Sequence, residues 1–136
     1  MIKKIIYLNL ITLFISMKVF SQTWVFSGEG KDGTKQYVRS EYLSKNNEGI
    51  KIWEKIEYPK LIIDKVVYTH AMEKDLVLIN CDRKQYVLLQ IVIFNKEGVI
   101  IQNYSFDDEN KWINVVPDSM AEGYMLKVCE LFDKKL

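Results

Sequence analysis

Side chains able to do chemistry are few and scattered. His70 is the only histidine of the chain, and Asp107, Asp108 and Glu109 stand together in one polar stretch. A lone histidine is weak evidence for a metal ligand or a general base, and adjacent carboxylates lack the ligand spacing of a known Ca²⁺ loop. We therefore interpret His70 as a surface or loop residue and the three acids as a solvated turn. We expect no metal site.

Patterns typical of catalytic sites are also missing. No Gly-x-Ser-x-Gly elbow and no phosphate-binding loop occur, and we interpret Gly28-Glu29-Gly30 as a glycine turn rather than a dinucleotide fingerprint. A haem would need an axial ligand, which His70 or Met72 could supply, but no spacing supports that role. We therefore predict a protein that is not an enzyme and has no cofactor.

The first residues have the layout of a secretory signal. Lys3 and Lys4 precede a mostly apolar run over residues 5–17, and Val19 and Ser21 occupy the positions that a signal peptidase requires to be small. The alternative is a retained membrane anchor, which needs about 20 apolar residues, whereas Lys18 ends this run early. We expect residues 1–21 to be a cleaved signal peptide, with no lipoprotein cysteine at the cut.

Residues 22–136 are long enough for a single domain with one core. Cleavage would remove three lysines and no acid, and would change the formal net charge from +1 to −2. Nucleic-acid-binding proteins usually carry a basic excess, so no nucleic-acid partner is expected. No second apolar run is long enough to span a bilayer, so we expect no transmembrane segment after cleavage.

Cys81 and Cys129 are the two cysteines of the chain. An even count in an exported protein favours a disulfide, and closing this loop would stabilise the fold by roughly 4 kcal/mol. Two free thiols are the alternative. A catalytic pair would typically be spaced Cys-x-x-Cys, and these residues are not. We predict a Cys81–Cys129 disulfide.

Hydrophobic patterning predicts mostly strands followed by one helix. Aromatic, β-branched or alternating segments favour strands at 23–27, 36–43, 50–58, 76–81, 85–95 and 99–106. Residues 59–72 fit either a short strand around 61–68 or an irregular excursion. Ser119 and Glu122 form a capping box for a helix ending near Phe132, with Met125, Cys129 and Phe132 on one face and Leu126 beside them.

Trp53 is the most informative single residue on these strands. Alternation places it with Lys51 and Lys55 on the face opposite Ile50 and Ile52. An exposed tryptophan is typical of partner-binding surfaces, so these three residues are the candidate partner contact. The alternative is that the helix or a neighbouring strand covers the ring.

The ordered set of motifs resembles the surface-adhesin protein E family of exported bacterial proteins. The shared elements cover nearly the whole of residues 22–136: Trp24, Tyr37-Val38, Ile50-x-Ile52-Trp53, Asn80-Cys81-Asp82-Arg83, the hairpin through Gly98, Trp112-x-x-Val115-x-Pro117 and Val128-Cys129. The resemblance implies an α+β fold, an antiparallel sheet of about six strands with a C-terminal helix packed on it, tied by the Cys81–Cys129 bridge. It also implies adhesin-like binding of host matrix or serum proteins, with haem linked to one member.

These observations favour an exported, non-enzymatic binding domain of the cell envelope. A carrier of haem or another small hydrophobic molecule and a structural envelope protein are the alternatives. The expected partner is a protein or envelope component that the sequence does not identify, and a homodimer is possible. The expected location is secreted, periplasmic or at the cell surface.

Overall fold

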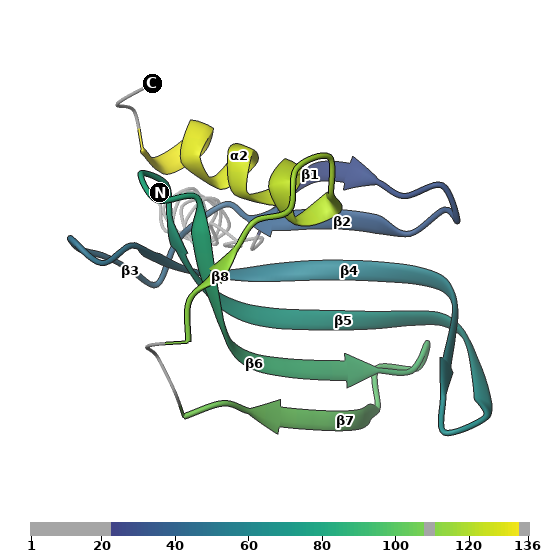
Figure 1. Cartoon of the computed structure of the whole chain (residues 1–136). Coiled ribbons are helices and arrows are strands. Elements are labelled where there is room, and N and C mark those ends of the chain that lie inside the picture. Colours follow the sequence, from purple (N-terminus) through teal and green to yellow (C-terminus); the bar gives the residue numbers. More distant parts are fainter. Residues whose placement is uncertain (1–22, 108–110, 134–136) are drawn as a thin grey trace, which may run out of the picture.

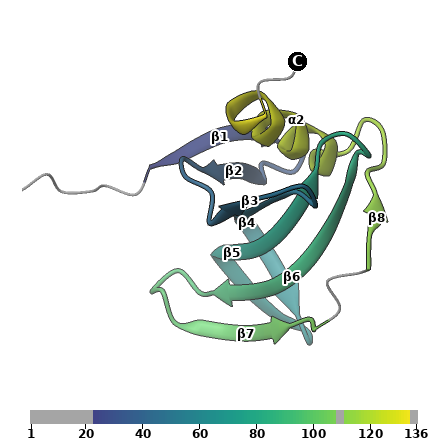
Figure 2. The same cartoon turned by 90° about the vertical axis from the view of Figure 1, so that its left-hand side faces the viewer.

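The computed structural model describes residues 23–107 and 111–133, and it shows one curled antiparallel sheet with a helix packed on it (Figures 1 and 2). The proposed signal peptide lies outside the described residues. The elements are β1 (Trp24–Glu29), β2 (Lys35–Arg39), β3 (Ser44–Lys45), β4 (Ile50–Ile63), β5 (Val66–Asn80), β6 (Gln85–Phe94), β7 (Ile100–Ser105), β8 (Ile113–Asn114) and α2 (Met120–Phe132).

Six strands form the main path of the sheet, in the order β1-β2-β4-β5-β6-β7. All neighbours are antiparallel, while β3 pairs with β4 and β8 pairs with β6. The predicted α+β fold is therefore confirmed. No helix within the described ranges is long and apolar enough to cross a membrane.

The segment that the sequence left ambiguous, residues 59–72, is the far half of one long β4–β5 hairpin (Figure 1). Asp64 and Lys65 form its turn, and both adopt positive φ, as the two central residues of a type I′ turn require. The cross-strand pairing skips Pro59 and His70, which lie between the pair of Tyr58 with Ala71 and the pair of Lys60 with Thr69. A proline has no N–H to donate, which accounts for the break at this point.

Helix α2 begins at the predicted cap. The Ser119 hydroxyl accepts a hydrogen bond from the Glu122 N–H (3.2 Å), and the Glu122 carboxylate accepts one from the Asp118 N–H (2.9 Å). In an ordinary capping box the Glu122 carboxylate would accept from the N–H of the N-cap residue Ser119, but here it accepts from the N–H of the residue before it. Leu126 is 53% exposed and lines a surface pocket together with Met125 and Cys129, so it lies at the edge of the inward face.

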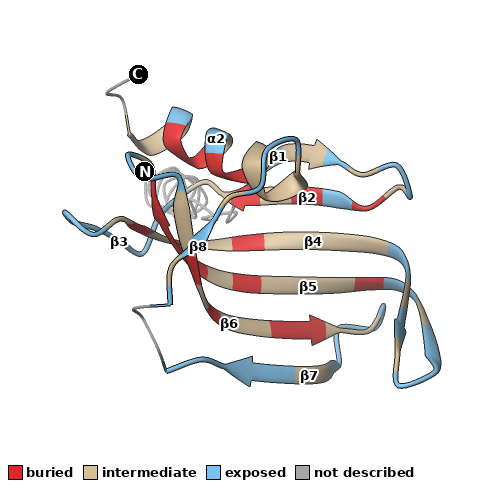
Figure 3. Cartoon of the chain, viewed as in Figure 1, coloured by how far each residue is buried: buried red, intermediate tan, exposed pale blue. Residues whose placement is uncertain are grey.

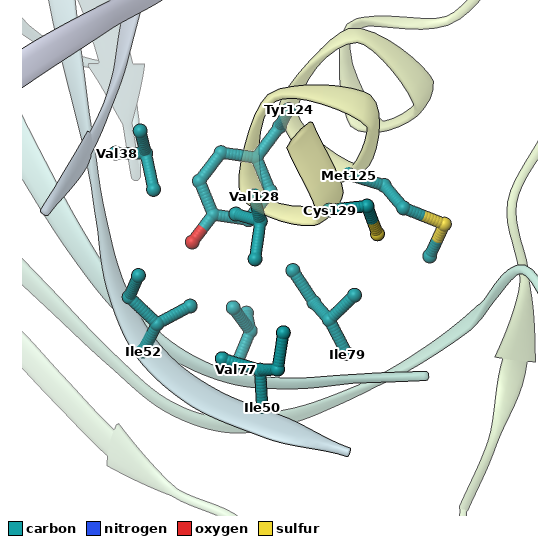
Figure 4. Packing of buried hydrophobic residues seen from close by; sticks show 9 residues of the cluster. All are labelled: Val38, Ile50, Ile52, Val77, Ile79, Tyr124, Met125, Val128 and Cys129. Atoms are coloured by element: carbon teal, nitrogen blue, oxygen red, sulfur yellow. The ribbon is translucent and has the colours of Figure 1, made fainter. Parts of the chain in front are cut away.

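The main core lies between the helix and one face of the sheet (Figures 3 and 4). It consists of Val38, Ile50, Ile52, Val77, Ile79, Tyr124, Met125, Val128 and Cys129. A smaller cluster covers part of the opposite face, where Leu78, Val87 and Leu89 pack with Leu76 and Trp112. Both faces of the central strands are therefore partly covered.

The predicted disulfide is confirmed. Cys81 and Cys129 are bonded with a Cα–Cα distance of 5.9 Å, and the described residues contain no free cysteine. Cys81 directly follows β5 and Cys129 lies near the end of α2. The bond therefore attaches the helix to the end of the central hairpin.

Replacing Gly123 by alanine should stabilise the protein by about 0.5–1 kcal/mol, because glycine is a poor helix former. A Cβ at this position would lie 4.0 Å from the Ser27 carbonyl oxygen, an ordinary contact. The packing of the helix on the sheet therefore does not require a glycine at this position. Urea unfolding measures the change.

Gly98→Ala is the matched control, because it also has space for a Cβ but has a φ of +82°. That variant should be destabilised, since alanine is strained at positive φ. A destabilised Gly123→Ala variant would contradict the helix position described above.

Candidate functional site

A groove of about 450 Å³ lies on the sheet face opposite the helix. In β4, Ile52 and Glu54 are buried on the helix side, and Trp53 between them points to the other face. The groove is lined mainly by aromatic and cationic side chains from five strands and the β2–β3 connection: Trp24, Arg39, Glu41, Tyr42, Leu43, Trp53, Lys74, Val92 and Phe94.

Three cations surround the ring of Trp24 within cation–π range. The Arg39 guanidinium lies 5.0 Å from the ring centroid, the Lys55 ammonium 5.4 Å and the Lys74 ammonium 5.9 Å. Lys74 also lies 5.2 Å from the centroid of Phe94. These contacts hold the aromatic and cationic groups of the groove in one connected arrangement.

Lys55 is held within this arrangement. Its ammonium lies 2.8 Å from the Glu57 carboxylate and 4.2 Å from the centroid of the Tyr37 ring, and only 14% of its side chain is exposed. Burial disfavours ionisation of Glu57, but the bond and charge of Lys55 outweigh it and lower the pKa of that carboxyl. Burial and the bond to Glu57 raise the pKa of Tyr37.

The three candidate contact residues therefore have different surroundings. Trp53 is half-buried and lines the groove, Lys55 lies against Trp24 and Tyr37, and Lys51 lies on the same face without lining the groove. The helix does not cover Trp53, because it packs on the other face. Sequence alternation identified this face, but it gave no sign that Trp24, Arg39 and Lys74 join it.

A cluster of buried acids on the helix side was missed by the sequence analysis. Glu54 pairs directly with Asp75 across β4 and β5, and Glu73 lies two residues before Asp75. Glu54 and Asp75 are each only 7% exposed. The Gln36 amide donates to Glu54, and the Tyr58 hydroxyl donates to Glu73 at 3.0 Å.

Burial dominates the electrostatics of this acid cluster. Desolvation, opposed by the Gln36 hydrogen bond, raises the pKa of Glu54 to about 7. Desolvation and the neighbouring charges of Glu73 and Glu54 raise the pKa of Asp75 to about 9. Burial likewise raises the pKa of Tyr58 and Tyr124. In sequence, Glu54 merely interrupts an apolar face, and only the pairing of β4 with β5 reveals the cluster.

The remaining candidate groups do not converge. His70 is exposed on the hairpin, and Asp107 is exposed, while Asp108 and Glu109 lie outside the described residues. In residues 23–107 and 111–133, no group of three or more His, Cys, Asp or Glu side chains is placed to hold a metal. Gly28 and Glu29 lie in β1 and pair with β2, so the expected glycine turn begins only after them. The chain then turns back into β2 rather than into a helix, so this segment lacks the setting of a dinucleotide site.

Comparison with known proteins identifies the family. The sequence model of the surface-adhesin protein E family matches residues 24–130, which include the groove, the acid cluster and both cysteines. No curated protein and no solved structure matches the chain significantly. The family description indicates an adhesin-like role at the cell surface. This chain belongs to the surface-adhesin protein E family.

Proposed function

We propose that this protein is an exported, non-enzymatic domain that binds a protein partner at the cell envelope or on a host surface through the groove around Trp24 and Trp53. The observation that carries the proposal is the placement of two tryptophans and two cations, Arg39 and Lys74, in one groove outside the helix-covered core. Tryptophan and arginine are enriched among residues that dominate binding energy. Family membership supports the same role.

The shape and charge of the groove favour a particular kind of partner segment. Its volume of about 450 Å³ suits a few side chains of a partner loop rather than a large cofactor. Arg39 and Lys74 favour an acidic segment, and the aromatic rings provide apolar surface beneath it. We infer that the groove binds an extended or looped segment with both acidic and apolar side chains.

Export is the other half of the proposal. The basic and apolar leader at residues 1–21 would direct the chain out of the cytosol and be removed before Gln22. The Cys81–Cys129 disulfide supports this, because such bonds persist in oxidising compartments. Mass spectrometry of the protein from its native cell should find a mature N-terminus at Gln22. A retained leader would contradict the cleavage.

Trp53→Ala should weaken partner binding about tenfold or more, since a tryptophan at the centre of an interface typically contributes over 1 kcal/mol. Binding of the mature domain is measured against immobilised matrix proteins, serum proteins and envelope extract. Arg39→Gln combined with Lys74→Gln should reduce both affinity and its dependence on salt.

Leu126→Ala is the matched control, because Leu126 is also exposed but lies on the helix. It should bind as the wild type does. Each variant is first checked for an unchanged unfolding midpoint. If Trp53→Ala and the charge variant bind normally while a Leu126 change weakens binding, the groove is not the partner site. Binding that appears only with a second copy of the chain would instead indicate a homodimer.

A further inference from the structure

A second cavity lies on the helix side of the sheet, separate from the groove. Its volume is about 270 Å³, and it is bounded by the first turns of α2 and by β2, β4, β5 and β6. Most of its wall is apolar, with Val77, Leu88 and Met120 among the lining residues. Glu54 and Asp75 of the acid cluster also line it. The cavity therefore combines an apolar chamber with two facing carboxyl groups.

Several polar atoms at this cavity have no hydrogen-bond partner among residues 23–107 and 111–133. They are the Asp75 Oδ1, the Gln36 Oε1 and the Tyr124 hydroxyl, and each of the three residues is more than nine-tenths buried. Figure 4 shows the Tyr124 hydroxyl directed away from the helix toward the sheet. Buried polar groups are satisfied in most native structures, so three unpartnered ones around one cavity point to a group that binds there.

The unpartnered atoms define the chemistry of that group. The Gln36 Oε1 can only accept hydrogen bonds, and so can the Asp75 Oδ1 once that carboxyl is ionised. Asp75 and Glu54 face each other across β5 and β4. No lysine or arginine of the described residues forms an ion pair with Glu54, Glu73 or Asp75. A ligand with several N–H donors would satisfy the unpartnered acceptors, and a positive charge on it would pair with the acids. The apolar walls suit a short hydrocarbon chain.

We propose that this cavity binds a small amphipathic amine, with its ammonium group between Glu54 and Asp75 and its hydrocarbon chain along Val77, Leu88 and Met120. An ammonium has three donors, which match the free acceptors of Asp75 and Gln36 and the Tyr124 hydroxyl. Its charge also favours the ionised forms of two carboxyl groups that face each other directly across β4 and β5. This site is independent of the groove and of partner binding.

Binding should release protons. The ionisable groups that face the ammonium position are Glu54 on β4, Asp75 and Glu73 on β5, Tyr58 on β4 and Tyr124 on α2. Burial keeps Asp75 largely protonated and Glu54 about half protonated near neutral pH, because their pKa values are raised to about 9 and about 7. A bound cation favours their ionised forms, so affinity should rise with pH up to the pKa of the amine.

The test is titration of the mature domain with n-hexylammonium, followed by calorimetry and by amide NMR shifts. We expect saturable binding, shifts confined to β4, β5 and the first turns of α2, and protons released to the buffer. n-Hexanol and n-hexanoate should bind at least tenfold more weakly. The double variant Glu54→Gln/Asp75→Asn should lose the binding, and Tyr124→Phe should weaken it severalfold.

Glu57→Gln is the matched control, because Glu57 lies on the opposite face of β4. It should bind n-hexylammonium as the wild type does. The proposal is overturned if hexanol binds as tightly as the amine, if no saturable binding occurs, or if binding survives in a folded Glu54→Gln/Asp75→Asn variant. If the double variant does not fold, two results together overturn the proposal. They are an unchanged affinity of Tyr124→Phe for n-hexylammonium and the absence of proton release when the amine binds to the wild type.

Discussion

Removing the disulfide should lower the free energy of unfolding by roughly 4 kcal/mol, the largest single loss that we expect in this chain. The bond closes a loop with a sequence separation of 48 residues, and it restricts the unfolded chain far more than the folded one. A fall of this size is a large part of the stability of a typical small domain. The double variant Cys81→Ser/Cys129→Ala makes the change with little other disturbance.

The choice of replacements follows from burial. Cys129 is 5% exposed within the core, where a serine hydroxyl would be left without a partner, while Cys81 is only partly buried. Urea unfolding gives the midpoint and slope, and wild-type protein treated with reductant should match the variant. A loss below about 1 kcal/mol would mean that the helix is held mainly by packing.

The second large effect concerns pH. Glu54→Gln should stabilise the protein by roughly 3 kcal/mol above neutral pH and leave it nearly unchanged in mild acid. In the folded protein, burial raises the pKa of Glu54 from 4.5 to about 7. The folded state thus holds this proton more tightly than the unfolded chain. Stability contributed by the protonated group is therefore complete below about pH 4.5 and is lost as pH rises toward about 7.

Asp75 should act in the same direction over a wider range, because its pKa is raised to about 9. Wild-type stability should therefore fall between mild acid and mild alkali, as measured by urea unfolding at several pH values. Glu57→Gln is the control of opposite sign: Glu57 has a lowered pKa and contributes stability that is lost on acidification. A wild-type curve that rises from mild acid to mild alkali would contradict the buried position of Glu54 and Asp75.

Local patterns predicted most of the fold because they depend on neighbours in sequence. Alternation over Ile50–Tyr58 predicted a strand and which side chains lie on each of its two faces. Ser119 and Glu122 predicted where the helix begins. The far half of the β4–β5 hairpin was not predictable in the same way. Its turn, Asp64-Lys65, has no glycine to mark it, and Pro59 usually argues against a strand interior.

The two sites depend on strand register, which a single sequence does not provide. Trp24 meets Arg39 because β1 pairs with β2, and Lys74 on β5 reaches Trp24 across β2 and β4, the two strands that lie between β1 and β5. Glu54 meets Asp75 for the same reason. No pattern within a single strand marks any of these residues as part of a site. The sequence therefore identified the sheet face that carries Trp53, but it identified neither the groove on that face nor the acid cluster.

Photo-crosslinking most directly tests the central claim, that partners bind in the groove. A photoreactive phenylalanine analogue is placed at Leu43, which lines the groove and is 60% exposed, or at Leu126, which is 53% exposed on the helix. The mature domain is then irradiated with matrix proteins and envelope extract. We predict a specific adduct from position 43 that Trp53→Ala abolishes, and none from position 126. Adducts from position 126 alone would place the partner on the helix and contradict the account.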